Sequence, residues 1–381
     1  MISFGTMTFF VLLAVLTLPA IVLGLTGRRL GPYGAVASTI GILALLAHSS
    51  RQLALFVAFV AWQFVLMKTH LWFIQRHGRQ VVWERRLAAL AALFPLALVK
   101  ATGVFDANLF GFLGVSYLTF RAVQVILEIS DGLIKEMPSW EYLYFLTFFP
   151  SVASGPIDRS RRFSADLATR LTPREYAALA GEGLRLLVLG AAYKFVAAAA
   201  LAHWAAGTGG GLPGTIAYMY LYGLQLFFDF AGYSWMAVGT AYLFGIRTPV
   251  NFRLPFIAES IKDFWNRWHI TLSFWFRDYL YSRLLMAMMR RKVFSNRHTA
   301  ARVALVANMT AMGIWHGTAL HYILYGLFHG LLLVANDIYE RSSSFYAAHK
   351  GATWYRIVAI VVTFHLVMFG FLIFSGRLIS V

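Results

Sequence analysis

The sequence predicts an all-α, polytopic integral membrane protein with about eleven transmembrane or re-entrant helices. Of the 381 residues, 59% are hydrophobic and 13% are charged, and the mean hydropathy is +0.66. A soluble domain carries roughly 25% charged residues, so this chain has too few to cover a water-exposed surface. Aromatic residues make up 16%, which is typical of a lipid-facing surface with interfacial anchors.

Apolar runs that approach the ~20 residues needed to cross a bilayer recur along the whole chain. We expect spans at residues 7–25, 33–47, 53–73, 87–99, 109–129, 183–202, 215–243, 303–315, 320–334 and 357–374. Two further apolar stretches, 142–163 and 257–289, are interrupted, and the second contains charged residues such as Lys262 and Asp278. Because a lipid-exposed helix does not tolerate these charges, we predict that both stretches are re-entrant or line a funnel.

The chain is expected to form one membrane domain, residues 1–381, with its core at 105–335. Short basic loops stay on the cytoplasmic side, and basic residues cluster at 28–29, 76–86, 159–162 and 290–292. This pattern places the N-terminus outside. The net charge of +17 indicates cytoplasmic loops beside anionic lipid, or an acidic partner. We discount nucleic acid as the partner because the basic residues lie in short clusters between apolar runs.

The absence of cysteine excludes disulfides, thiolate nucleophiles and Cys-ligated metals. Any covalent acyl intermediate would then need a hydroxyl or an imidazole. The histidines lack the compact spacing of a zinc site, so we expect no metal.

Chemistry-bearing residues concentrate in two motifs of the last third. The first is Lys-Asp-Phe-Trp-Asn-Arg-Trp-His at 262–269, in which Asp263 and Arg267 are spaced as helical ion-pair partners. At the same spacing, Asn266 and His269 would share one helical face. The second motif, Gly-Ile-Trp-His-Gly at 313–317, places His316 between glycines in an apolar span, where an ionisable residue indicates function by default.

Other polar residues leave two interpretations open. Asp229, inside the 215–243 span, either binds a neighbouring helix or orients a polar group in a reaction chamber. The Ser-Gly-Pro-Ile-Asp-Arg segment at 154–159 is a basic interfacial turn or the lip of a cytoplasmic funnel. His321, His329 and His365 are expected to be packing or interfacial residues.

These motifs resemble the membrane-bound O-acyltransferase family. The resemblance rests on Ser-Gly-Pro-Ile-Asp-Arg at 154–159, Asp-Phe-Trp-Asn-Arg-Trp-His at 263–269, Phe-Trp-Phe-Arg-Asp at 274–278 and Trp-His-Gly at 315–317, and it covers most of the chain. It implies helices ringed around a central funnel, where a cytoplasmic acyl donor meets an extracellular acceptor. It also implies that His316 is the catalytic histidine and His269 the second family histidine.

Within the family, Gly-Pro-Ile-Asp-Arg and Trp-Asn-Arg are similar to members that transfer D-alanyl groups to teichoic acid. Alginate-type O-acetyltransferases tend to have Gly-Pro-Ile-Val-Arg and Trp-Arg-Arg there. The resemblance thus implies a D-alanyl thioester donor, carried on the phosphopantetheine of a carrier protein, with no tightly bound cofactor. It also implies an acceptor that is a cell-envelope polymer or an intermediary protein, and a location in the bacterial cytoplasmic membrane. The residues themselves do not distinguish D-alanyl from acetyl.

Acyl transfer needs a base for the acceptor hydroxyl and hydrogen-bond donors for the oxyanion. We expect a neutral His316 to be the base, and a direct transfer from thioester to hydroxyl. The residues expected to contact the substrates are Trp265, Asn266, Arg267, Ser273, Arg277, Asp229, Trp315 and Gly317.

A methionine-rich segment followed by basic residues suggests where the donor arrives. An acidic carrier protein is expected to dock on Leu285, Met286, Met289, Arg290 and Arg291. The alternative is a helix lying in the lipid interface. A transporter or flippase, or a non-catalytic scaffold, remains the rival class, although no inverted repeat supports a transporter.

Overall fold

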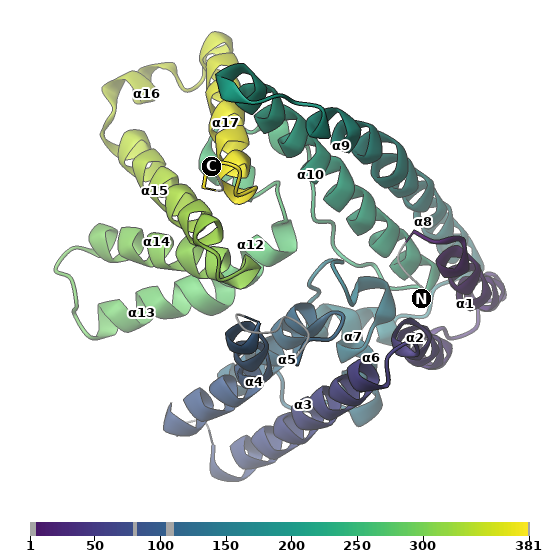
Figure 1. The fold of residues 1–381 in the computed structure, drawn as a ribbon. Coiled ribbons are helices and arrows are strands. Elements are labelled where there is room, and N and C mark those ends of the chain that lie inside the picture. Colours follow the sequence, from purple (N-terminus) through teal and green to yellow (C-terminus); the bar gives the residue numbers. More distant parts are fainter. Residues whose placement is uncertain (1–4, 79–81, 104–109, 380–381) are drawn as a thin grey trace. The chain divides into compact units, whose positions relative to one another are not determined.

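The computed structural model describes residues 5–78, 82–103 and 110–379, and in these ranges the chain is helical without a strand. The helices of its first half are α1 (Met7–Leu25), α2 (Gly31–Leu46), α3 (Ser50–His77), α4 (Val82–Thr102), α5 (Val115–Asp131), α6 (Ser139–Leu146), α7 (Ser160–Ala168), α8 (Pro173–Ala192) and α9 (Ala198–Ala206). Those of its second half are α10 (Gly211–Leu243), α11 (Ile261–Trp265), α12 (Ile270–Phe276), α13 (Ser282–Arg290), α14 (Arg297–His316), α15 (Leu320–Ser342), α16 (Ser344–His349) and α17 (Thr353–Phe374), drawn in Figure 1.

Each predicted span overlaps a helix, but the 109–129 span is helical only from Val115, where α5 begins. The run at 7–25 matches α1 from end to end, whereas 183–202 falls in a longer helix formed by α8, a π-helical turn at Tyr193–Ala197, and α9. Parts of the predicted basic loop at 76–86, residue 109 of the 109–129 span and the start of the 105–335 core lie outside the described residues.

Among the described residues, five helices are long and apolar enough to cross a membrane. They are Met7–Leu25, Ser50–His77, Pro173–Ala206, Leu320–Ser342 and Thr353–Phe374. The chain is therefore a multi-pass membrane protein.

The contacts divide the chain into two compact units. One comprises residues 1–192 and 232–249, and the other 193–231 and 250–381. The boundaries fall at the end of α8 and inside α10.

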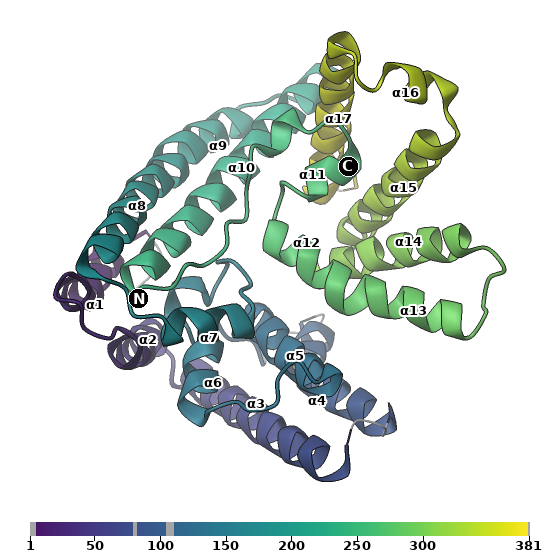
Figure 2. The ribbon, with the colours of Figure 1, turned by 180° about the vertical axis from the view of Figure 1, so that it is seen from behind.

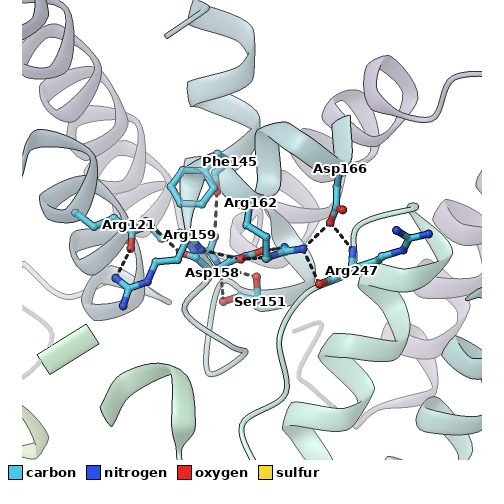
Figure 3. A network of polar contacts seen from close by, with 9 residues as sticks. Arg121, Phe145, Ser151, Asp158, Arg159, Arg162, Asp166 and Arg247 are labelled. Carbon is cyan, nitrogen blue, oxygen red and sulfur yellow. Dashed lines mark hydrogen bonds and ion pairs between the residues drawn. The ribbon is translucent and has the colours of Figure 1, made fainter. Parts of the chain in front are cut away.

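In the first unit, a buried arginine holds the interrupted stretch at 142–163. Arg121 of α5 is 1% exposed, and its guanidinium donates to the carbonyl oxygen of Ser151 at 2.9 Å (Figure 3). It also donates to the carbonyl oxygen of Leu146 at 3.1 Å. These bonds satisfy backbone groups that α6 and the following 3₁₀ turn, Phe149–Ser151, leave unpaired where the helix ends. The chain then continues to Asp158, whose carboxylate is paired with Arg162.

In the second unit, α14 and α15 form an antiparallel hairpin with their backbones in contact (Figure 1). A Cβ on Gly313 would lie 2.3 Å from the carbonyl oxygen of Tyr322, and one on Gly326 would lie 2.4 Å from that of Met309. Only glycine fits at such distances, so these residues set the separation of the two helices. We call the contact of Gly313, Gly326 and Gly330 with the facing helix the glycine seam.

The stretch 257–289 is interrupted between α11 and α12. A 3₁₀ turn, Pro255–Ile257, and the short α11 come first, and after the break α12, a π-helical turn at Arg277–Tyr281, and α13 continue as one helix (Figure 2). This helix contains Arg277 and Asp278 and is not among the five candidate membrane spans of the described residues. One sequence argument is wrong here. Asn266 and His269 do not share a helical face, because α11 ends at Trp265 and α12 begins at Ile270.

Candidate active site

His316 is the last residue of α14, at the tip of the α14–α15 hairpin. Its half-buried imidazole is surrounded by aromatic rings. The ring centroids of Trp315 and Phe374 lie 4.6 and 5.0 Å away, and those of Tyr322 and Tyr325 lie 6.2 Å away. These rings form a largely apolar wall beside the imidazole.

The packing of Tyr322 explains why the second glycine of the motif, Gly317, follows His316. A Cβ at this position would lie 2.4 Å from the Tyr322 ring, so a larger residue would displace that ring from beside His316. The flanking glycines therefore allow α15 to approach α14 closely on both sides of His316.

His269 precedes α12 in a left-handed backbone conformation, with φ of 43°. Its side chain is 3% exposed, and Nε2 has no hydrogen-bond partner among the described residues. The Phe230 ring packs edge-on at 4.6 Å, and the Trp315 ring lies at 6.4 Å. Since Trp315 also neighbours His316, the two histidines lie beside the same indole, and both belong to the second unit.

The break before His269 is stabilised by a segment that passes alongside. Ile270 N–H donates to the Asn251 carbonyl at 3.0 Å, and Arg253 N–H donates to the Arg267 carbonyl at 3.0 Å. The buried Asn251 side chain also accepts a bond from Thr271 Oγ1 at 2.6 Å. These bonds satisfy the backbone where it leaves helical geometry, so that His269 is held in its strained conformation.

A cavity of about 470 Å³ lies between α11, α12, α14 and α15; we call it the α14 cavity. Four residues predicted to bind substrate line it: Trp265, Asn266, Ser273 and Arg277. Its volume lies in the range of small-molecule sites, roughly 300–1,000 Å³.

The inner end of the α14 cavity comes within about one helical turn of the two histidines, but His269, His316, Trp315 and Gly317 do not line it. Met312 lines the cavity and precedes His316 by one turn on the same face of α14. Ser273 also lines it, and its N–H donates to the His269 carbonyl at 3.0 Å. A helical turn rises about 5.4 Å, so a group in the inner cavity lies about one turn from each histidine.

Other predicted residues make different contacts. Arg267 pairs with Asp263, with Nε 2.9 Å from Oδ1, as the spacing predicted, and it does not line the α14 cavity. Asp229 pairs with Lys194, with Oδ1 2.5 Å from Nζ. Arg277 stacks on Phe274, with its guanidinium carbon 4.1 Å from the ring centroid. The interpretation of Asp229 as a partner of a neighbouring helix is thus the one its contact supports.

The predicted docking segment forms α13 and the residue after it. Met286 and Met289 are 48% and 44% exposed, Leu285 is half-buried, and Arg290 and Arg291 are exposed. The helix leads from Tyr281, which lines the α14 cavity, and is followed by α14, whose first turn contributes His298 to the same lining. The exposed methionines therefore lie on the element next to the outer end of the cavity.

Sequence reasoning missed two polar residues, Arg121 and Asn308. Arg121 holds the 142–163 stretch, and Asn308 is buried on α14 and lines the cavity. Both lie inside apolar runs, so a lone polar residue within a predicted span was the signal that would have found them.

The sequence also matches known proteins. The sequence profile of the membrane-bound O-acyltransferase family matches residues 212–377, which include both histidines. Similar proteins include the teichoic acid D-alanyltransferase of Bacillus subtilis, 40% identical over 99% of this chain and 98% of that protein. The protein of the same name from Streptococcus thermophilus is 38% identical over 98% of this chain and 95% of that protein.

A probable alginate O-acetylase of Pseudomonas syringae is 32% identical, but the match covers 70% of this chain and 49% of that protein. The full-length similarity is thus to the D-alanyltransferases. This chain belongs to the membrane-bound O-acyltransferase family and is an O-acyltransferase.

Proposed function

We propose that this protein transfers a D-alanyl group from a carrier-protein thioester to a hydroxyl of teichoic acid, or of a protein that passes the group to it. The observation that carries the proposal is the nearly full-length similarity to teichoic acid D-alanyltransferases, combined with the presence of His269 and His316 beside one indole, about one helical turn from the lining of the α14 cavity. The protein would act in the cytoplasmic membrane of a bacterium.

The reaction follows from the placement of His316. Its neutral imidazole accepts the proton of the acceptor hydroxyl while the oxygen attacks the thioester carbonyl. The C–S bond breaks, the sulfur takes the proton from the imidazolium, and an ester and a free thiol are formed. The chain has no cysteine that could form an enzyme-bound thioester, and direct transfer from donor to acceptor does not need one.

We assign to the unpaired Nε2 of His269 the role of stabilising the negative charge that develops on the thioester carbonyl oxygen during the reaction. As the N–H tautomer it donates a hydrogen bond to the oxyanion, and burial strengthens that bond. The left-handed backbone fixes this side chain before substrate arrives, so little reorganisation is needed during the reaction.

The donor is proposed to enter along the α14 cavity from a carrier protein docked on α13. The exposed Met286 and Met289 supply an apolar contact, and Arg290 and Arg291 attract an acidic partner. The phosphopantetheine arm of the carrier then extends through the cavity toward His316.

The test uses purified protein in lipid nanodiscs with carrier protein charged either with D-alanine or with acetate. We expect thiol release and acceptor labelling with the D-alanyl donor, and a loss of at least about 100-fold in His316→Ala, as for removal of a positioned base. His365→Ala is the matched control, because this histidine is exposed on α17 and its hydrogen bond among the described residues is to the Val361 carbonyl of its own helix. Preference for the acetyl donor would instead assign an O-acetyltransferase, and more than a tenth of wild-type turnover in His316→Ala would remove the role of this residue.

A further inference from the structure

Arg377, three residues beyond the end of α17, is a half-buried arginine that neutral groups hold in place. Its guanidinium stacks on the Tyr218 ring, with the guanidinium carbon 4.2 Å from the ring centroid. It donates to Thr208 Oγ1 at 3.2 Å and to the Gly209 carbonyl at 3.1 Å. These bonds use two of the five N–H groups of the guanidinium. The position of the cation is therefore fixed, while other N–H groups remain for a ligand.

Arg377 lies at the same end of the second unit as His316. The ring of Phe374, three residues earlier, has its centroid 5.0 Å from that of His316. A Cβ on Gly376 would lie 3.3 Å from Nδ1 of His321, which is in the first turn of α15. The end of α17, the start of α15 and the proposed base are thus neighbours.

This end of the unit is remote from the loop that follows α13. That loop leads to the first residue of α14, and His316 is the last residue, so the 20 residues of α14 separate them by about 30 Å. The predicted orientation has the basic loop at 290–292 in the cytoplasm. The end with Arg377 then faces outward, on the side from which the acceptor arrives.

The charge of Arg377 is not balanced by an acid. Among the described residues, no carboxylate pairs with it, whereas Arg356 at the start of the same helix pairs with Glu259, with Nη2 2.6 Å from Oε1. The segments that meet around Arg377, at 203–222, 314–325 and 374–379, contain no aspartate or glutamate. A fixed cation in surroundings without acids favours an anion as its ligand.

We propose that Arg377 binds a phosphate of the acceptor and thereby positions the acceptor chain beside His316. This inference rests on the proposed function, which supplies teichoic acid, a phosphodiester polymer, as the acceptor. The guanidinium donates to the phosphate oxygens through the N–H groups that Thr208 and Gly209 leave free. Arg377 touches substrate and takes no part in proton transfer.

The experiment compares two synthetic acceptors, each supplied with D-alanyl-carrier and the protein in nanodiscs. One acceptor has three glycerol units joined by phosphodiesters, and the other is the same molecule with each phosphate methylated to a neutral triester. We expect kcat/KM of the wild-type protein to be about tenfold higher with the charged acceptor, the effect of one hydrogen-bonded contact between opposite charges.

Variants of Arg377 separate its charge from its packing. Arg377→Gln removes the charge but keeps a hydrogen-bond donor, so it should lose about tenfold with the charged acceptor and little with the neutral one. Arg377→Lys should keep part of the preference, because lysine retains the charge without the planar array of donors. Arg356→Gln is the matched control, since it removes an arginine from the other end of α17 and should keep the tenfold preference.

Equal rates of the wild-type protein with the two acceptors would overturn the proposal without any variant, so poor folding of Arg377→Gln does not affect the test. An equal loss on both acceptors in Arg377→Gln would also overturn it, because the arginine would then only hold the turn before α10. A tenfold preference that persists in this variant would place the phosphate elsewhere.

The outcomes also separate this inference from the proposed function. Transfer of D-alanine to a membrane protein, but to neither oligomer, would overturn the inference and leave the proposed function with its protein acceptor. If D-alanyl-carrier is not discharged by the wild-type protein with any acceptor, the proposed function itself is removed.

Discussion

The guanidinium of Arg121 donates to both the carbonyl oxygen and the hydroxyl of Ser151, at 2.9 and 2.5 Å, and so ties the middle of α5 to the 3₁₀ turn that follows α6. A buried cation needs hydrogen-bond acceptors, and here backbone carbonyls and the Ser151 hydroxyl accept from the two terminal nitrogens of Arg121, whereas its Nε has no partner among the described residues.

Arg121→Met should therefore lower the free energy of unfolding by roughly 2–5 kcal/mol, because it leaves several buried carbonyl groups without donors. Thermal unfolding in detergent, followed by size-exclusion chromatography, measures the loss. Arg121→Lys retains the charge and part of the hydrogen bonding, so its unfolding temperature should lie between those of the wild-type protein and Arg121→Met. If Arg121→Met unfolds at the wild-type temperature, the 142–163 stretch is held by other contacts.

The backbone of His269 predicts an unusual order of stability between two truncations. His269→Ala and His269→Gly both remove the imidazole and should both lose acyl transfer. At φ of 43°, however, alanine is strained and glycine is not, so His269→Gly should be more stable than His269→Ala by about 1 kcal/mol. Thermal unfolding of the two variants side by side tests this. Alanine that is equal or superior to glycine would show that the left-handed conformation is not retained.

The glycine seam predicts that one methyl group disrupts the hairpin. A Cβ on Gly326 would lie 2.4 Å from the Met309 carbonyl oxygen, so Gly326→Ala should force α14 and α15 apart at a cost of roughly 1–3 kcal/mol. Turnover should fall as well, because His316 is at the end of the displaced helix. Gly181→Ala is the control, since a Cβ there meets no atom within 4 Å and alanine favours the helix. If Gly326→Ala and Gly181→Ala unfold at the same temperature, the close contact at Gly326 does not limit the separation of the two helices.

Carrier docking on α13 predicts different effects for its apolar and basic residues. Met289→Asp should weaken carrier binding strongly, because the new carboxylate places a negative charge in the apolar contact and is repelled by an acidic carrier. Replacing Arg290 and Arg291 by Ala should weaken binding modestly and flatten its dependence on salt. Binding to detergent-solubilised protein over a range of ionic strength measures both effects, with His316→Ala as a variant expected to bind normally. Wild-type binding by Met289→Asp would identify α13 as a lipid-facing interfacial helix.

Hydrophobic run length was sufficient to locate the long helices, as the agreement of 7–25 with α1 shows, because a bilayer imposes length and apolarity locally. The geometry around His269 could not be predicted in this way. Helical spacing placed Asn266 and His269 on one face, but bonds from Asn251 and Arg253 satisfy the backbone of a break at that point. Hydrogen bonds between residues distant in the sequence produce no periodic pattern from which they could be predicted. The ion pair of Asp263 and Arg267 was predictable because it depends only on residues four apart.

The glycine seam also bears on permeability. An enzyme that brings together substrates from opposite sides of a membrane risks conducting ions or protons along the same route. With the backbones of α14 and α15 in contact at Gly313 and Gly326, there is no room between the two helices for a lipid chain or a file of water molecules. The seam between α14 and α15 is therefore closed to such leakage where it runs up to His316.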